Sequence, residues 1–232
     1  MRWLAVAIAC CAAGPAQAYD CSSLAATLRA GLDDAAHHPL ALANPAPTTG
    51  GEASAGEACD DFARAARALA HPDRDAERGT LAGHRAAAWS DGPHGSGHYW
   101  NVALAVDLGG GRVVGACVVT PTPGWRNLSD RGHRLFGRWR TLAGDRFVVW
   151  TTLAAGEAEY ESLIYALVYR LRGDALELDR AATLHELDRM GRVYATAPSR
   201  PGDVEAAALH RAAAAAYRAL VDGTSCASGP QR

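Results

Sequence analysis

Lysine is absent from this chain of 232 residues, and all 23 of its basic residues are arginine. Without lysine the chain has no P-loop phosphate clamp, no amine for a Schiff base and no Ser-x-x-Lys acylation site. Arginine in place of lysine, together with abundant alanine, is typical of proteins from GC-rich bacterial genomes. The missing residue therefore excludes P-loop nucleotide hydrolysis and several covalent mechanisms.

Long apolar runs are also scarce. The run from Trp3 to Ala13 is too short to cross the hydrocarbon core of a bilayer, and no later segment is a better candidate. One arginine precedes this run and Ala-Gln-Ala follows it, which is the layout of a cleavable export signal over residues 1–18. We expect cleavage after Ala18, a mature chain without a transmembrane segment, and a periplasmic or secreted location.

A surplus of charge of one sign is missing as well. The formal net charge is −2 at pH 7, and the predicted signal removes Arg2 from the mature chain. Such a balance gives no overall basic field to attract nucleic acid or an anionic membrane. Nucleic acid is therefore not an expected partner, and any charge-driven partner must meet a local patch.

Cysteine is sparse but informative. Two of the six cysteines lie in the predicted signal, which leaves Cys21, Cys59, Cys117 and Cys226. In an oxidising compartment four cysteines can pair in three ways, which sequence alone does not distinguish. We favour Cys21 with Cys59, since each lies near the start of a helix-like segment, and a second bridge from Cys117 to Cys226 would pin the tail. A zinc site is less expected, because no two of the four are closely spaced.

The N-terminal part of the mature chain, residues 19–77, is predicted to be helical. Leucines at positions 24, 28 and 32 line one face of a short helix, which His37-His38-Pro39 would end. Residues 40–57 are rich in Ala, Pro, Gly and Thr and predict a flexible linker. Asp60 and Asp61 would then open a second helix that stops at His71-Pro72.

Residues 78–190 are predicted to form an antiparallel β domain. Apolar and polar residues alternate from Tyr99 to Leu108, with the period of a half-buried strand. Similar patterns and glycine turns give about seven strands in a meander, namely 80–89, 99–108, 113–120, 135–142, 147–153, 159–171 and 176–183. We expect a curled or barrel-like sheet.

The C-terminal part, residues 191–232, is predicted to be a helix and a tail. Asp203 can cap this helix and Gly223 can end it. A short helix over residues 184–190 would precede it. The expected fold class is therefore α+β, with N-terminal helices, an antiparallel meander and a C-terminal helix.

A glycine-rich segment before the Tyr99 strand carries Asp91, His94 and His98. Two imidazoles and a carboxylate suit a divalent transition metal, and an open position on that metal would activate water for hydrolysis. Glu159 or Glu161 would then be a possible base. The alternative is that these are ordinary turn residues in solvent, which is the more frequent case.

A second segment combines arginines with an aromatic ring. Its candidate ligand-binding residues are Arg126, Arg134, Phe136, Arg138 and Arg140. Guanidinium groups bind carboxylates and phosphates and stack on rings, so an anionic glycan, a lipid headgroup or an acidic protein patch would fit. The alternative is a solvated face on which arginine replaces lysine.

Two functional hypotheses follow from these residues. The first is an exported, non-catalytic binding or interaction protein, such as an inhibitor or immunity factor, without a cofactor. The second is a secreted metal-dependent hydrolase that uses Asp91, His94 and His98. Other enzyme motifs fail, since the segment from His185 has arginine at position 189, where a zinc protease needs histidine. The first hypothesis is favoured.

Overall fold

The computed structural model describes residues 20–43, 53–73, 76–91, 99–121, 140–154, 162–196 and 204–226. Within these ranges the fold is α+β, as predicted. The prediction of one meander of about seven strands is wrong, because the described residues form eight strands in two antiparallel four-stranded sheets. The helices there are α1 (Cys21–His37), α2 (Ala53–Ala70), α4 (Arg180–Thr196) and α5 (Val204–Asp222).

The first sheet is a simple meander in chain order. Its strands are β2 (Ala76–Leu81), β3 (His84–Asp91), β4 (Tyr99–Asp107) and β5 (Val113–Pro121). The second sheet has the order β1-β8-β7-β6, with β1 (Leu40–Ala41), β6 (Phe147–Ala154), β7 (Ser162–Arg172) and β8 (Ala175–Leu178). Strands 99–108, 113–120 and 147–153 were therefore predicted correctly to within one residue at each end.

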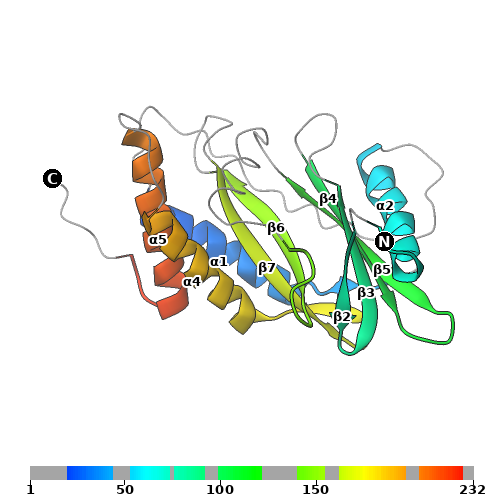
Figure 1. The fold of residues 1–232 in the computed structure, drawn as a ribbon. Coiled ribbons are helices and arrows are strands. Elements are labelled where there is room, and N and C mark those ends of the chain that lie inside the picture. Colours follow the sequence, from blue (N-terminus) through cyan, green and yellow to red (C-terminus); the bar gives the residue numbers. More distant parts are fainter. Residues whose placement is uncertain are drawn as a thin grey trace.

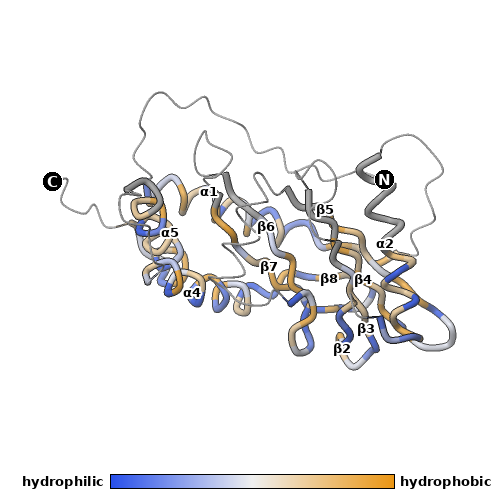
Figure 2. The backbone as a smooth tube through the Cα atoms, turned by 45° about the horizontal axis from the view of Figure 1, so that its top comes forward, coloured by the Kyte–Doolittle hydropathy of each residue, from blue (hydrophilic) through white to orange (hydrophobic). Residues whose placement is uncertain are grey.

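The two sheets pack face to face, with helices on the outer sides. Figure 1 shows α2 on the outer side of the β2–β5 sheet. Helices α1, α4 and α5 pack together on the outer side of the sheet that contains β6 and β7. The inner faces share one core, in which Leu104, Phe147 and Leu176 are fully buried. Figure 2 shows hydrophobic segments along the strands and hydrophilic residues at the β2–β3 turn. Alternation along each strand thus supplies both an inner face and a helix-covered outer face.

Two short contacts join the edges of the sheets. On one side β1 pairs with β8, and two residues later Ala43 pairs with Gly115 of β5. On the other side Leu142 pairs with Phe147 of β6, and the Glu77 carboxylate of β2 accepts hydrogen bonds from the backbone N–H groups of Thr141 and Leu142. These contacts curl the strands around the shared core, in agreement with the predicted curled sheet.

Helix α4 covers the edge of β7 where β8 has ended. The Val168 N–H donates to the hydroxyl of Thr183 at 3.0 Å, and the Ile164 N–H donates to the hydroxyl of Tyr194 at 3.0 Å. The Tyr217 hydroxyl of α5 donates to the Ile164 carbonyl at 2.8 Å. Side-chain hydroxyls therefore take the place of a further strand and protect an edge that would otherwise be open.

The segment 40–57 differs from the predicted linker. Leu40 and Ala41 form β1, Leu42 is buried, and helix α2 begins at Ala53, before the expected Asp60. The bulky residues Leu40 and Leu42, although few, are enough to place this stretch in the core. Residues 44–52 lie outside the described residues.

Three strand predictions need correction. The predicted strand 80–89 is a hairpin, because Ala82 and Gly83 have φ values of 50° and 80° and turn the chain. The predicted strand 176–183 ends at Leu178, because Asp179 caps helix α4 by accepting a hydrogen bond from the Ala182 N–H. Of residues 140–142 in the predicted strand 135–142, Leu142 alone pairs with a strand, in a single bridge to Phe147, and residues 135–139 lie outside the described residues.

The expected helices are longer than predicted. Helix α4 replaces the short helix over 184–190, so the proposed boundary between 190 and 191 falls inside a helix. The C-terminal helix is confirmed, and Gly223 ends it with φ 65°. Helix α1 ends at His37, as predicted, and Asp20 caps its start by accepting from the N–H groups of Ser22 and Ser23.

The favoured disulfide pairing is wrong. Cys21 is bonded to Cys226, with 5.9 Å between their Cα atoms, and not to Cys59. The pairing of Cys117 with Cys226 is excluded for the same reason. Helices α1 and α5 pack together, so the start of α1 meets the chain that follows α5.

Candidate functional site

The ends of three neighbouring strands form one edge of the β2–β5 sheet. Strand β3 ends at Asp91, which pairs with Asn101 near the start of β4. Tyr99, the first residue of β4, pairs with Pro121, the last residue of β5. Both predicted functional segments, 92–98 and 122–139, therefore leave the sheet from the same edge, and we call this edge the strand-end edge.

The structure places two of the predicted site residues. Asp91 is the last residue of β3. Arg140 is exposed, and its backbone carbonyl accepts a hydrogen bond from Trp150 Nε1 of β6 at 3.0 Å. The other predicted residues lie outside the described residues, namely His94, His98, Arg126, Arg134, Phe136, Arg138, Glu159 and Glu161.

The arginine-rich segment is anchored on both sheets. It begins after Pro121 in β5 of the first sheet, and it ends at Arg140 beside Trp150 of β6 in the second. Trp150 is buried, and the neighbouring Thr141 is buried with its N–H bonded to Glu77. A segment anchored at each end to a packed core is a typical position for binding residues.

The ring of Trp89 packs against helix α2 close to the strand-end edge. Trp89 lies two residues before Asp91, is buried, and faces helix α2. The guanidinium carbon of Arg64 lies 5.0 Å from the centre of its ring, within the range of a cation–π interaction. Trp89 Nε1 is buried and makes no hydrogen bond to any of the described residues, and among these the packing of α2 and the Arg64 guanidinium hold the ring in place.

Metal-ligand geometry is not found in the described part of the chain. There, no three His, Cys, Asp or Glu side chains are grouped as a metal site. In helix α4, Glu186 binds Arg189 at 2.8 Å, so the incomplete zinc-protease motif that begins at His185 contains a surface ion pair.

Four tyrosines beside the second sheet have hydroxyls that are shielded from solvent, and the sequence analysis did not single them out. Burial raises the pKa of Tyr165, while a hydrogen bond with Thr151 acts in the opposite direction. Burial also raises the pKa values of Tyr169, Tyr194 and Tyr217. These hydroxyls are neutral at pH 7 and suit hydrogen bonding rather than base catalysis. Tyr165 and Tyr169 lie on one face of β7. Tyr194 of α4 and Tyr217 of α5 contact each other, with ring centroids 5.8 Å apart. No local pattern in the sequence predicted the burial of these rings.

Comparison with known proteins does not assign the chain to a family. No family model matches it, and neither a curated protein nor a solved structure shows significant similarity to it. Among the described helices, none is long and apolar enough to span a membrane.

Proposed function

We propose that this chain is an exported, non-catalytic binding or interaction protein that holds an anionic partner with its arginine-rich segment. The observation that carries the proposal is the double anchoring of this segment, after Pro121 on one sheet and at Arg140 beside Trp150 on the other. The residues that would bind are Arg126, Arg134, Phe136, Arg138 and Arg140.

The disulfide supports an exported protein. Such bonds persist in oxidising compartments and are rare in the cytosol. The Cys21–Cys226 bond joins the beginning of the first described helix to the last described residue. If the predicted signal is cleaved after Ala18, this bond closes the mature chain close to its N-terminus.

The chemistry of the segment supports an acidic partner. Several guanidinium groups beside an aromatic ring can form paired hydrogen bonds with carboxylate, sulfate or phosphate. The chain as a whole is slightly acidic, so such binding would depend on this local group of arginines and not on net charge. An anionic glycan, a lipid headgroup and an acidic surface on another periplasmic protein all fit.

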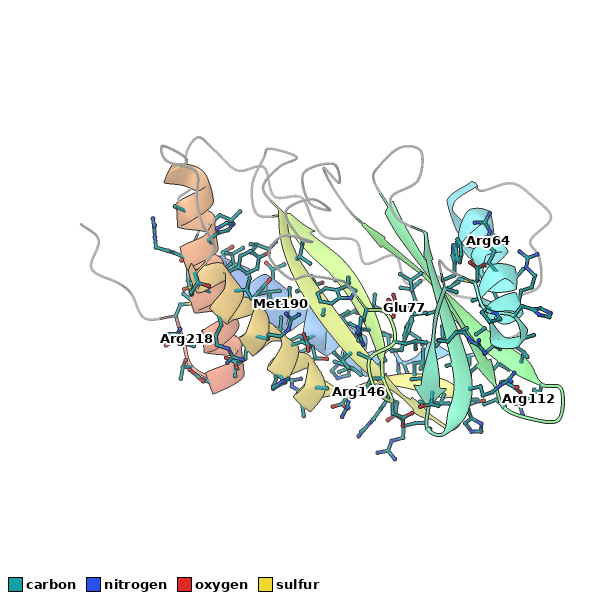
Figure 3. All side chains as sticks on the ribbon, in the orientation of Figure 1. Arg64, Glu77, Arg112, Arg146, Met190 and Arg218 are labelled. Carbon is teal, nitrogen blue, oxygen red and sulfur yellow. A yellow bond between two sulfur atoms is a disulfide. The ribbon has the colours of Figure 1, made fainter. Side chains whose placement is uncertain are left out.

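A charge-matched pair of triple variants tests the proposal. R126A/R134A/R138A removes three arginines of the segment, and R112A/R211A/R218A removes three exposed arginines from a β-turn and from α5. Figure 3 shows Arg112 and Arg218 far apart, at opposite sides of the molecule. The probes are an immobilised sulfated glycan, vesicles of phosphatidylglycerol, and a periplasmic extract.

We expect the wild-type chain to bind at least one probe. The segment variant should lose roughly tenfold or more in affinity, since a single charge-assisted hydrogen bond contributes about 1.5–3 kcal/mol. The control variant should bind like the wild type. Failure to bind all three probes, or equal losses in both variants, would contradict the proposal.

The alternative function is a metal-dependent hydrolase that uses Asp91, His94 and His98. In its favour, Asp91 ends β3 directly before the segment that carries both histidines. A bound metal that is lost on chelation would distinguish this hydrolase from a binding protein without a cofactor.

A further inference from the structure

We propose that the mature protein contains a second disulfide, between Cys59 of α2 and Cys117 of β5, which fastens α2 to the β2–β5 sheet. The proposal is independent of the binding function. It depends on the position of α2 across the sheet and on the cysteines that remain after Cys21 has bonded to Cys226.

Two cysteines remain once the known bond and the predicted signal are taken into account. Cys21 and Cys226 use each other, and two further cysteines lie in the predicted export signal. Cys59 and Cys117 are then the remaining cysteines of the mature chain. In an oxidising compartment such a pair forms a bond wherever the fold brings its members within reach.

Helix α2 runs across the β2–β5 sheet. The Phe62 ring lies against Gly115 of β5, whereas further along the helix the Leu69 carbonyl accepts a hydrogen bond from Arg78 of β2 at 3.3 Å. The helix therefore crosses the sheet from β5 towards β2. Cys59 belongs to the turn before Phe62, so it lies on the β5 side of this crossing.

The two cysteine positions lie on facing surfaces of the helix and the sheet. Residues three apart in a helix share a face, so Cys59 falls on the face that contains Phe62. In β5, Cys117 is two residues beyond Gly115 and points to the same side of the sheet. Cys117 is partly buried and packs against the cluster that contains Phe62, so both positions belong to the α2–sheet interface.

The bond would strengthen a contact between small side chains. Beneath α2 the sheet presents mainly alanine, with Ala87, Ala103 and Ala105 buried against the helix. These residues allow close approach but bury little apolar area each. A covalent link would hold α2 in place, and with it the Arg64–Trp89 contact beneath the strand-end edge.

The bond would form by thiol–disulfide exchange. The thiolate of one cysteine attacks the disulfide of an external dithiol oxidant and releases one of its thiols. The second cysteine then displaces the other thiol, so the protein loses two hydrogens and the oxidant gains two. Oxidised glutathione supplies this chemistry in vitro.

Peptide mapping tests the proposal on the wild-type protein. Cleavage after arginine leaves the four cysteines in four different peptides, residues 19–29, 30–64, 113–126 and 219–232. The protein is exported to a periplasm, alkylated in denaturant without reductant, and digested. We expect peptide 30–64 linked to 113–126, peptide 19–29 linked to 219–232, and no alkylated cysteine.

Alkylation of both Cys59 and Cys117 under these conditions would overturn the proposal, as would a link from either one to a different cysteine. Single variants give matched controls. C117S should expose the Cys59 thiol alone, and C226S should expose the Cys21 thiol alone while peptides 30–64 and 113–126 stay linked. Because the mapping of the wild type needs no variant, a variant that fails to fold does not remove the test.

Discussion

The ring of Phe62 in helix α2 lies against the backbone of Gly115 in strand β5. A Cβ atom on Gly115 would overlap both this ring and the Leu104 carbonyl of the adjacent strand. Gly115 also exchanges two backbone hydrogen bonds with Ala43, at 2.7 and 2.9 Å. One glycine therefore allows a helix and two strand segments to meet.

The substitution G115A should destabilise the protein severely. The added methyl group cannot be accommodated without moving Phe62 or the sheet backbone, so we expect the free energy of unfolding to fall by about 2–4 kcal/mol. Urea unfolding followed by circular dichroism measures this loss.

Gly79 provides the matched control. It also lies in a strand, but its added Cβ would meet only the Leu142 side chain, at 3.7 and 3.8 Å, which is ordinary contact. We expect G79A to change the free energy of unfolding by less than about 1 kcal/mol, and in the stabilising direction if the chain entropy of the unfolded state dominates. Equal effects of G79A and G115A would contradict the packing argument.

Glu77 joins the β2 edge to the segment before β6. One carboxylate oxygen accepts the N–H groups of Thr141 at 2.8 Å and of Leu142 at 2.9 Å, and Figure 3 shows Glu77 between the two sheets. E77A leaves both donors without this acceptor and should lower the free energy of unfolding by about 2 kcal/mol. E77Q should cost less, because its amide oxygen can still accept.

The control for Glu77 is the exposed Glu177 in β8. We expect E177A to change the free energy of unfolding by no more than about 0.5 kcal/mol. If E77A and E177A have equal effects, Glu77 does not join the sheets.

Buried tyrosines should make the protein sensitive to alkali. Burial raises the pKa of Tyr194 and of Tyr217, so in the folded state both stay protonated above the ordinary value of 10.0. The unfolded chain then binds fewer protons than the folded chain above about pH 10, and stability must fall as the pH rises. Each such tyrosine contributes at most about 1.4 kcal/mol per pH unit.

The absence of lysine simplifies this measurement, because no lysine side chain titrates in the same range as tyrosine. Urea unfolding at several values between about pH 8 and about pH 11 gives the slope of the free energy of unfolding against pH. Y217F should reduce the slope while it weakens the protein at pH 7 by the lost bond to the Ile164 carbonyl. A stability that does not change from pH 8 to pH 11 would contradict the prediction.

The elements with strong local patterns were predictable from the sequence. Strand β4 shows apolar alternation along its whole length, and the end of helix α1 is marked by His37-His38-Pro39. Gly223 likewise ends α5, as its position after an alanine-rich helix suggested. In each case the determining interactions lie within a few residues of one another along the chain.

The features that depend on distant contacts were missed. The pairing of Cys21 with Cys226 requires α1 and α5 to pack together, and a sequence read alone contains no sign of that contact. Strand β1 has only two residues and exists because β8 is beside it. In the candidate site, the strand register places Asp91 and Pro121 at the same edge of the sheet. The contact between Tyr194 and Tyr217 depends on the packing of α4 against α5, and no local pattern in the sequence predicts it.

Chelation distinguishes the proposed binding protein from the alternative hydrolase. A metal held by Asp91, His94 and His98 would stabilise the folded chain, by about 2.7 kcal/mol at a hundredfold excess over its dissociation constant, and a chelator would remove that gain. For a binding protein without a cofactor we expect the mass in native spectrometry and the unfolding midpoint to be the same with and without chelator. A stoichiometric metal that is lost on chelation and abolished by H94A/H98A would instead favour the hydrolase. H37A/H38A, which changes two exposed histidines at the end of α1, is the matched control and should leave any such metal bound.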